Sequence, residues 1–323
     1  VGFSYAPDFS NTIFIDRVLK FALLGFFIAA FVTTPGRIGW FVAAFLFACM
    51  KMGQEGFVGT ITGSAMWENQ GVMRLHGSTP NYAHPNSFAG MALGCLPFIF
   101  YFYGIVPWYL RLMLLVQLVF ALNIVLFTGS RTGYAALAIG LGFLAWKAKN
   151  RKRAFLIMLL AVVVIAPLIP QQYIERARTM LTQEDLQGRS IDTRKQILKD
   201  AWQVFLDAPL GVGVSAFPAV RQDRFGRQQD THNLYLEVAT NLGIQGVIIF
   251  FGLVFALLRT LSWLTASLDR QIKLVGQTLA GRPQVDPRSA YLPEHLQDLQ
   301  IMRATCMAVY VFLIIRLGLG LFG

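Results

Sequence analysis

The sequence predicts an all-α protein: a polytopic bundle of transmembrane helices with a largely helical domain in one outer loop. Hydrophobic residues make up 55% of the 323 residues and charged residues only 14%, which is the balance of an integral membrane protein. Apolar runs also recur along the chain, and several approach or reach the roughly 20 residues that a helix needs to cross the lipid core. Together these two observations give the fold class.

About eight such runs are present by this length criterion, and each is expected to form a spanning helix. They are residues 21–34, 38–50, 87–106, 110–127, 134–146, 154–169, 242–258 and 302–321. The second and fifth runs are short for a span and must recruit flanking small or weakly polar residues. The sequence opens on Val1 rather than methionine and has no visible cleavable signal peptide, so we expect it to be the later part of a longer protein, with N-terminal spans missing.

Basic residues set the orientation of the bundle. The densest basic cluster, residues 147–153, contains no acid and links two apolar runs, so the positive-inside rule makes it cytoplasmic. Alternation then places residues 33–37, 104–111 and 259–303 inside, and residues 56–86, 128–132 and 171–231 outside. Arg17 and Lys20 fit this scheme poorly, which a missing upstream span or an interfacial first helix would explain.

The chain is therefore expected to divide into three parts. Residues 1–170 hold the first spans and the outer loop 56–86. Residues 171–231 form a loop domain on the outer face, and residues 232–323 hold the last spans with the cytoplasmic connection 259–303. Membrane lipids are the expected surroundings of all the spans.

The placement of the charges, cysteines and acids argues against a nucleic-acid-binding protein and against a metal site. The net charge is +11, but its position along the chain follows membrane topology, and no basic platform interleaved with aromatics indicates nucleic-acid binding. The three cysteines stand in apolar runs without C-x-x-C spacing, as buried thiols do. Glu184 and Asp185 are isolated, and no acidic pair has convincing metal-ligand spacing. We expect no metal and no cofactor.

The outer loop 171–231 contains an amphipathic helix. Leu198, Trp202 and Phe205 share one helical face, which is expected to lie against the membrane surface or the bundle. Asp192 or Thr193 can cap the start of this helix, and Pro209 with the following Gly211-Val-Gly213 ends it. Arg194 stands one turn before Leu198, so its guanidinium is expected at the edge of the apolar face, near lipid headgroup height.

Two more arginines stand in outer turns. Arg74 belongs to Gly71-Val-Met-Arg-Leu-His-Gly77, and Arg131 to Thr128-Gly-Ser-Arg-Thr-Gly133. Neighbouring glycines let an arginine approach a ligand closely, and its planar fork suits phosphate oxygens. The alternative for Arg131 is an anchor that snorkels to the headgroups.

His232 is a titratable imidazole at the end of the polar outer loop. Of the four histidines, it alone has a glycine, Gly243, eleven positions on. The alternatives are a helix-capping or hydrogen-bonded histidine beside Asn233, and His76 or His84 as rival bases. Asp230 or another carboxylate is left open as the group that orients the imidazole, whereas Glu237 does not have a facing helical spacing.

At these residues the sequence resembles the O-antigen ligase family, whose members are membrane glycosyltransferases. Four features carry the resemblance. They are Arg74-Leu-His-Gly77 with His84-Pro-Asn-Ser-Phe-Ala89, the Gly-Ser-Arg131-Thr-Gly turn, Arg194-x3-Leu198 followed by Trp202, Phe205, Pro209 and Gly211-Val-Gly213, and His232-x10-Gly243. The match runs from about Asp16 to the C-terminus in order and topology.

The resemblance implies a glycan donor linked to undecaprenyl diphosphate, and an acceptor hydroxyl that attacks its anomeric carbon. His232 is then the expected general base, and Arg74, Arg131 and Arg194 are expected to bind the departing pyrophosphate. Supporting roles are expected for His84, Asn86, Asn233 and Arg189. The transfer is expected to need no metal and, without a covalent intermediate, to invert the anomeric centre.

The resemblance leaves the acceptor open. It is lipid A–core in a ligase, a second repeat unit in a polymerase, and a protein serine or threonine in an oligosaccharyltransferase. The outer-loop patterns favour the ligase, at the periplasmic face of a bacterial inner membrane. A transporter of the same lipid-linked glycan is the alternative from another class, but it would favour internal repeats and ionisable groups within spans. Arg316 is the main example of such a group.

Overall fold

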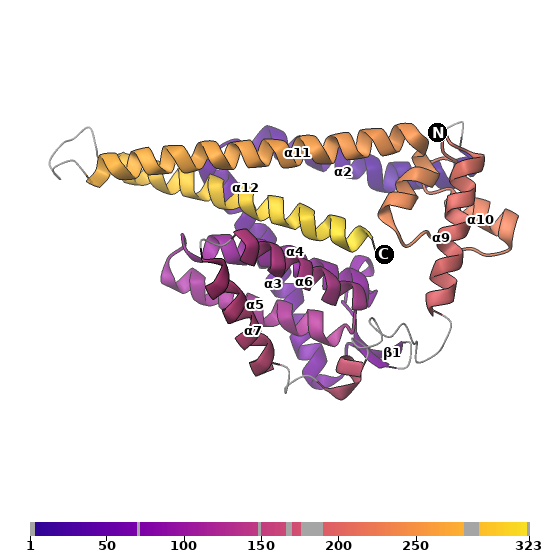
Figure 1. The fold of residues 1–323 in the computed structure, drawn as a ribbon, viewed down its shortest axis with the longest axis horizontal. Coiled ribbons are helices and arrows are strands. Elements are labelled where there is room, and N and C mark those ends of the chain that lie inside the picture. Colours follow the sequence, from indigo (N-terminus) through magenta and orange to yellow (C-terminus); the bar gives the residue numbers. More distant parts are fainter. Residues whose placement is uncertain are drawn as a thin grey trace. The chain divides into compact units, whose positions relative to one another are not determined.

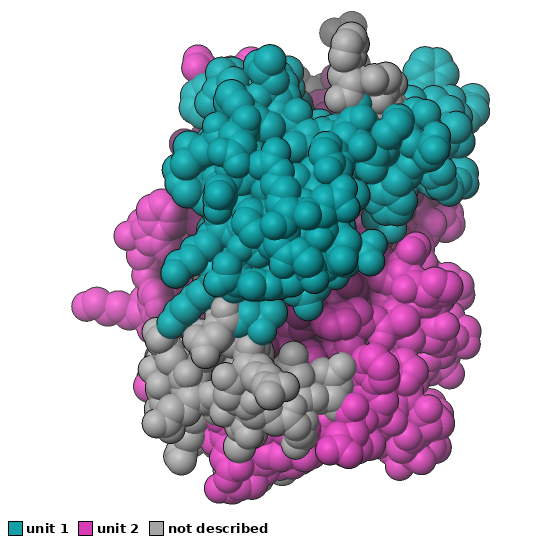
Figure 2. All heavy atoms as spheres, turned by 90° about the vertical axis from the view of Figure 1, so that its right-hand side faces the viewer, with its two compact units in different colours: residues 1–32, 181–257, 317–323 teal, residues 33–180, 258–316 magenta. Residues whose placement is uncertain are grey.

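The computed structural model describes residues 4–69, 72–147, 150–165, 170–175, 190–280 and 291–321 (Figure 1). Helices form nearly all of its regular structure, and the exception within these residues is one short hairpin. The all-α prediction is therefore confirmed. The chain divides into two compact units, coloured separately in Figure 2. Unit 1 comprises residues 1–32, 181–257 and 317–323, and unit 2 comprises residues 33–180 and 258–316.

Unit 2 is a bundle built around one central helix. Its elements are α3 (Pro35–Thr62), β1 (Met66–Asn69), β2 (Val72–Leu75), η2 (Pro80–Tyr82), α4 (Pro85–Tyr103), α5 (Trp108–Phe127), α6 (Arg131–Lys147) and α7 (Arg151–Ile165), with parts of α11 (Leu234–Ala280) and α12 (Leu292–Gly320). The apolar stretch of α4 is 61% buried, against 28% for α3 and for α5. Phe98 of α4 packs edge-to-face on Phe312 of α12. Helices α11 and α12 lie side by side (Figure 1). Asp269 of α11 forms an ion pair with Arg303 of α12.

Five of the described helices are long and apolar enough to cross a membrane, namely α3, α4, α5, α11 and α12. The sequence predicts about eight spans by the length criterion. The other three runs coincide with α2 (Lys20–Phe31), α6 and α7, which have 12, 17 and 15 residues as described. A polytopic membrane protein is therefore supported, while the number of spans is not confirmed. Large apolar side chains remain exposed along these helices, as lipid-facing surfaces require.

Four helix boundaries differ from those expected. Helix α3 continues to Thr62, so the first residues of the predicted outer loop 56–86 are helical, and the hairpin pairs Met66 with Leu75 in antiparallel register. Helices α11 and α12 likewise extend well into the predicted connection 259–303, because a helix can continue beyond the apolar run that marks its span. Helix α9 (Ser190–Asp207) begins before Asp192 and Thr193, so these residues lie in its first turn and are not its cap.

Unit 1 packs α9 against α10 (Phe217–Phe225). Its remaining elements are α1 (Pro7–Ile13), the π-helical turn η1 (Phe14–Leu19), α2, the first part of α11 and the end of α12. Ala201 and Val204 of α9 are fully buried with Phe217 and Val220 of α10. The face of α9 that carries Trp202 and Leu198 is instead exposed, with Trp202 at 53%. The predicted apolar face thus lies beside the buried one, and its contact with a membrane surface stays a prediction.

Two glycines make a backbone crossing that fixes the end of α9 against α11. Gly243 interrupts α11 with φ 68° and ψ −167°, a conformation essentially confined to glycine. Around this break Val212 N donates to Thr240 O and Ile244 N donates to Pro209 O, both at 2.9 Å. A Cβ on Gly243 would lie 2.3 Å from the carbonyl carbon of Leu210, and one on Gly211 would lie 2.6 Å from the Gly243 nitrogen. Only glycine lets the two backbones approach this closely.

We predict that Gly243→Ala destabilises unit 1 by at least about 2 kcal/mol, because the new methyl group meets backbone atoms and strains the conformation. Thermal unfolding of the detergent-solubilised protein measures this. Gly252→Ala is the matched control on the same helix, because its Cβ would meet nothing within 4 Å. Equal unfolding temperatures for the two variants would contradict a required glycine crossing.

Candidate functional site

His232 stands in the short link between α10 and α11. Its φ is 48°, a left-handed value that a non-glycine residue adopts only where its surroundings hold it. The Oδ1 atom of Asn233 accepts hydrogen bonds from the backbone nitrogens of Tyr235 and Leu236, both at 3.1 Å. The side chain of Asn233 therefore caps α11. The capping role considered for His232 is filled by Asn233 instead.

Both sides of His232 are fixed by hydrogen bonds. Thr231 is buried, and its hydroxyl donates to Asn233 O at 3.0 Å and accepts from Asn233 N at 3.3 Å. Asn233 Nδ2 donates to Leu321 O at 3.0 Å, and the hydroxyl of Tyr235 donates to Leu317 O at 2.9 Å. The end of α12 and the start of α11 therefore hold the backbone that presents His232.

The imidazole of His232 titrates below its ordinary range. Partial desolvation by surrounding protein atoms is the main cause that lowers its pKa from 6.5, followed by the positive charge of Arg194. The carboxylate of Asp230 raises the pKa and Arg221 lowers it. Unit 1 therefore brings Arg194 and His232 within electrostatic reach and favours the neutral imidazole at neutral pH. Asp230, which the sequence left open as the group that orients the imidazole, is thus an acid whose charge favours protonation of His232.

Arg221 is the member of this group that the sequence patterns did not single out. It is fully buried and forms an ion pair with Asp200 of α9, with 2.9 Å between Nε and Oδ2. The signal that could have revealed it is the i, i+4 spacing from Phe217, which places Arg221 on the apolar face of α10. A buried arginine with a buried carboxylate is costly to desolvate and needs an explanation.

Arg74 lies in unit 2 with its side chain fixed on two sides. It stands on β2 and is only 2% exposed. Its Nε donates to Thr128 O at 2.8 Å, and its Nη2 donates to Asn86 Oδ1 at 3.0 Å. The hairpin, the start of α4 and the turn before α6 thus meet at one guanidinium.

Asn86 is the centre of this second cluster. Its Oδ1 also accepts from the hydroxyl of Ser130 at 2.9 Å, and that hydroxyl accepts from Gly133 N at 3.0 Å. Arg131 follows Ser130 directly and begins α6. His84 precedes α4 and its Nδ1 accepts from Asn86 N at 3.2 Å, so it acts locally as a helix cap. Unit 2 therefore brings Arg74, His84 and Asn86 together, and Arg131 follows Ser130 of the same cluster in the chain.

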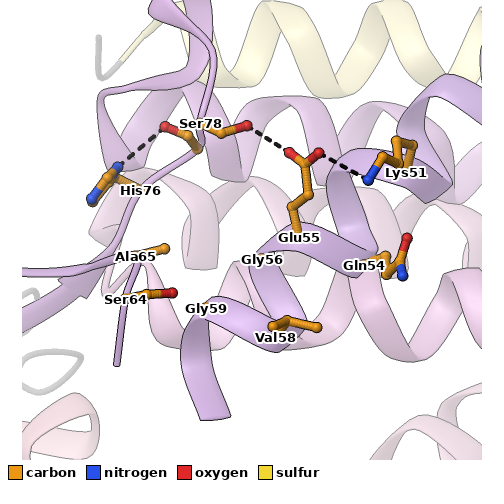
Figure 3. Close-up of a pocket in the computed structure, with 11 residues that line it drawn as sticks. Lys51, Gln54, Glu55, Gly56, Val58, Gly59, Ser64, Ala65, His76 and Ser78 are labelled. Carbon is orange, nitrogen blue, oxygen red and sulfur yellow. Dashed lines mark hydrogen bonds and ion pairs between the residues drawn. The ribbon is translucent and has the colours of Figure 1, made fainter. Parts of the chain in front are cut away.

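The remaining candidates lie elsewhere. Arg189 is outside the described residues. His76 lines a pocket of about 460 Å³ beside α3, where the Glu55 carboxylate accepts from Ser78 at 2.6 Å and pairs with Lys51 at 3.2 Å (Figure 3). None of the proposed catalytic or pyrophosphate-binding residues lines this pocket. Across the described ranges, no three His, Cys, Asp or Glu side chains are grouped as metal ligands.

Comparison with known families identifies one domain. Residues 116–251 match the model of the family described as O-Antigen ligase, which confirms the resemblance seen in the motifs. The matched range contains Arg131, Arg194 and His232, whereas Arg74 precedes it. Comparison with curated proteins found no match.

We predict that Asn86→Leu destabilises unit 2 by about 1–3 kcal/mol, because the buried guanidinium of Arg74 and the Ser130 hydroxyl lose their shared acceptor. Asn86→Asp is the matched control, since its carboxylate can accept from both donors. Thermal unfolding in detergent separates the two variants. A leucine variant as stable as wild type would show that Asn86 is not needed to hold Arg74.

Proposed function

We propose that this protein, whose residues 116–251 match the O-antigen ligase family, transfers a glycan from undecaprenyl diphosphate to an acceptor hydroxyl. We place the reaction at the periplasmic face of a bacterial inner membrane and favour lipid A–core as the acceptor. The observation that carries the proposal is the placement of His232 in unit 1, with its pKa lowered by burial and by Arg194. Several apolar helices and the family match support a multi-pass membrane enzyme.

The proposed step has one base and one leaving group. The acceptor oxygen forms a bond to the anomeric carbon while the bond from that carbon to the pyrophosphate breaks. His232 takes the hydroxyl proton, for which its imidazole must be neutral. The lowered pKa favours that form at neutral pH. Direct displacement in one step inverts the anomeric centre.

The pyrophosphate leaves with negative charge that fixed cations can stabilise. We assign this role to Arg74, Arg131 and Arg194, because a guanidinium stays charged when partly desolvated and offers a planar fork to phosphate oxygens. The hydrogen bonds from Arg74 to Thr128 and Asn86 hold its guanidinium plane in advance of binding. We assign supporting roles to His84, Asn86, Asn233 and Arg189. Base and cations together supply what a metal-independent transfer needs.

The choice of acceptor rests on the outer-loop patterns around Arg194 and His232, which favour a ligase. A repeat-unit polymerase and a protein O-oligosaccharyltransferase would use the same donor and the same arginines. Loss of the gene separates them. Polymer retained on the lipid carrier with bare core indicates a ligase, single repeats on core a polymerase, and unglycosylated protein the third. If the protein were a transporter, the purified protein would show no glycan transfer activity.

We predict that His232→Ala lowers transfer at least about 100-fold in an assay with purified protein, lipid-linked donor and acceptor, because the base is lost. Arg194→Ala and Arg131→Lys are also expected to impair transfer, the latter because lysine cannot make a bidentate contact. His295→Ala is the matched control, since His295 is an exposed residue at the start of α12. Undiminished transfer by His232→Ala would remove the general base from the proposal.

The pH dependence of transfer follows from the direction in which the pKa of His232 is shifted. Protonated His232 cannot accept a proton, so activity falls as pH drops through its pKa, and a lowered pKa puts the acidic limb of kcat/KM below pH 6.5. Asp230 raises this pKa. We therefore predict that Asp230→Asn moves the limb to still lower pH, while Asp207→Asn, whose carboxylate pairs with Arg224, leaves it in place. A limb that Asp230→Asn does not move would contradict the assignment.

A further inference from the structure

The strongest unexplained feature of unit 1 is the buried ion pair between Arg221 and Asp200. Their side chains are 0% and 2% exposed. Desolvating two charges costs more than packing two apolar side chains of similar volume, so such a pair is weak evidence for stability alone. Its value lies in geometry, because each charged group has fixed directions in which it must be satisfied.

The pair connects three parts of unit 1. Asp200 lies on α9, six residues after Arg194, and Arg221 lies on α10. The Nη1 atom of Arg221 donates to Oε1 of Gln229 at 3.0 Å, and Gln229 precedes His232 by three residues. A single guanidinium thus joins the helix of Arg194 to the segment that leads into His232.

Both ends of this connection are themselves held. Oδ1 of Asp200 accepts from Gln196 Nε2 at 2.7 Å, and Oδ2 lies 3.8 Å from Nη1 of Arg227. The Nη2 atom of Arg221 is buried and has no acceptor among the described residues, so the contacts made by Nε and Nη1 define its orientation.

The backbone of His232 needs such support. Its left-handed φ persists only when neighbouring contacts hold it. Thr231 and Asn233 supply contacts on the side of α11. On the side of α10, Gln229 is anchored by Arg221.

We propose that Arg221 is a positioning residue for His232, acting through Gln229 on one side and through Asp200 of α9 on the other. It holds the imidazole in its partly desolvated position and keeps it in register with Arg194. This inference rests on the proposed function for its catalytic meaning, but the position of the imidazole is testable without any activity.

The direct test breaks the connection at its exposed end. Gln229→Ala removes the acceptor of Arg221 Nη1 and leaves the buried ion pair intact, and Gln228→Ala is the matched control at the adjacent exposed position. The measurement is an NMR titration of histidine-labelled protein in detergent, with the His232 signal identified by its loss in His232→Ala. We expect Gln229→Ala to raise the pKa of His232 towards its ordinary value, because the imidazole becomes more solvated, and Gln228→Ala to leave it unchanged.

A second variant tests the ion pair itself. Arg221→Met alone leaves a buried carboxylate without its partner and is expected to fold poorly. The double variant Asp200→Leu/Arg221→Met replaces both charges with apolar groups and is expected to fold. Its His232 titration is expected to move upward, because the positive charge of Arg221 is lost together with its hydrogen bond to Gln229. An unchanged His232 titration in Gln229→Ala, or in the folded double variant, would overturn the proposal.

Measurements of turnover link the position of the His232 imidazole to catalysis. If His232 is the base, Gln229→Ala lowers kcat roughly 10- to 100-fold through misplacement of the imidazole, with little change in KM. If His232→Ala proves fully active, the general-base assignment fails, while the titrations still decide whether Arg221 positions His232. The two failures are therefore distinguishable.

Discussion

The backbone crossing of Gly211 and Gly243 is the constraint on which the rest of unit 1 depends. The two glycine backbones meet where any Cβ would lie within 2.7 Å of several backbone atoms of the other segment. Hydrogen bonds from Val212, Gly213 and Ile244 close the crossing on both sides. Because Gly211 lies four residues after the end of α9 and Gly243 lies in α11, this contact sets where α9 ends relative to the start of α11. Arg194 and His232 are carried on those two elements.

The two units prepare charged groups by different means. In unit 2, hydrogen bonds to the carbonyl of Thr128 and the amide of Asn86 fix the guanidinium plane of Arg74. In unit 1, Arg221 is neutralised by Asp200, while Arg194 remains half-buried and lowers the pKa of His232. A guanidinium held in a fixed plane suits a pyrophosphate, and a neutral imidazole suits proton removal. The proposed transfer uses both.

The sequence was sufficient for the fold class and for the resemblance of these motifs to one family, because apolar runs and motif order are local properties of the chain. It also singled out Gly243 and Gly211, but not their contact, which depends on segments about thirty residues apart coming together. Arg221 was missed because an arginine in a charge-balanced loop usually stays solvated. The hairpin was missed because its strands have only four residues each. The predicted number of spans stays unconfirmed, because five of the described helices meet the length and hydropathy of a span.

The central claim is that His232 is the base whose neutral form carries out transfer. Since kcat/KM reports ionisations of the free enzyme, the most direct measurement compares the His232 pKa, obtained by NMR titration of the free protein, with the acidic limb of kcat/KM in the same detergent. The account predicts that the two values coincide below pH 6.5 in the wild type. An acidic limb that does not coincide with the His232 titration would contradict it.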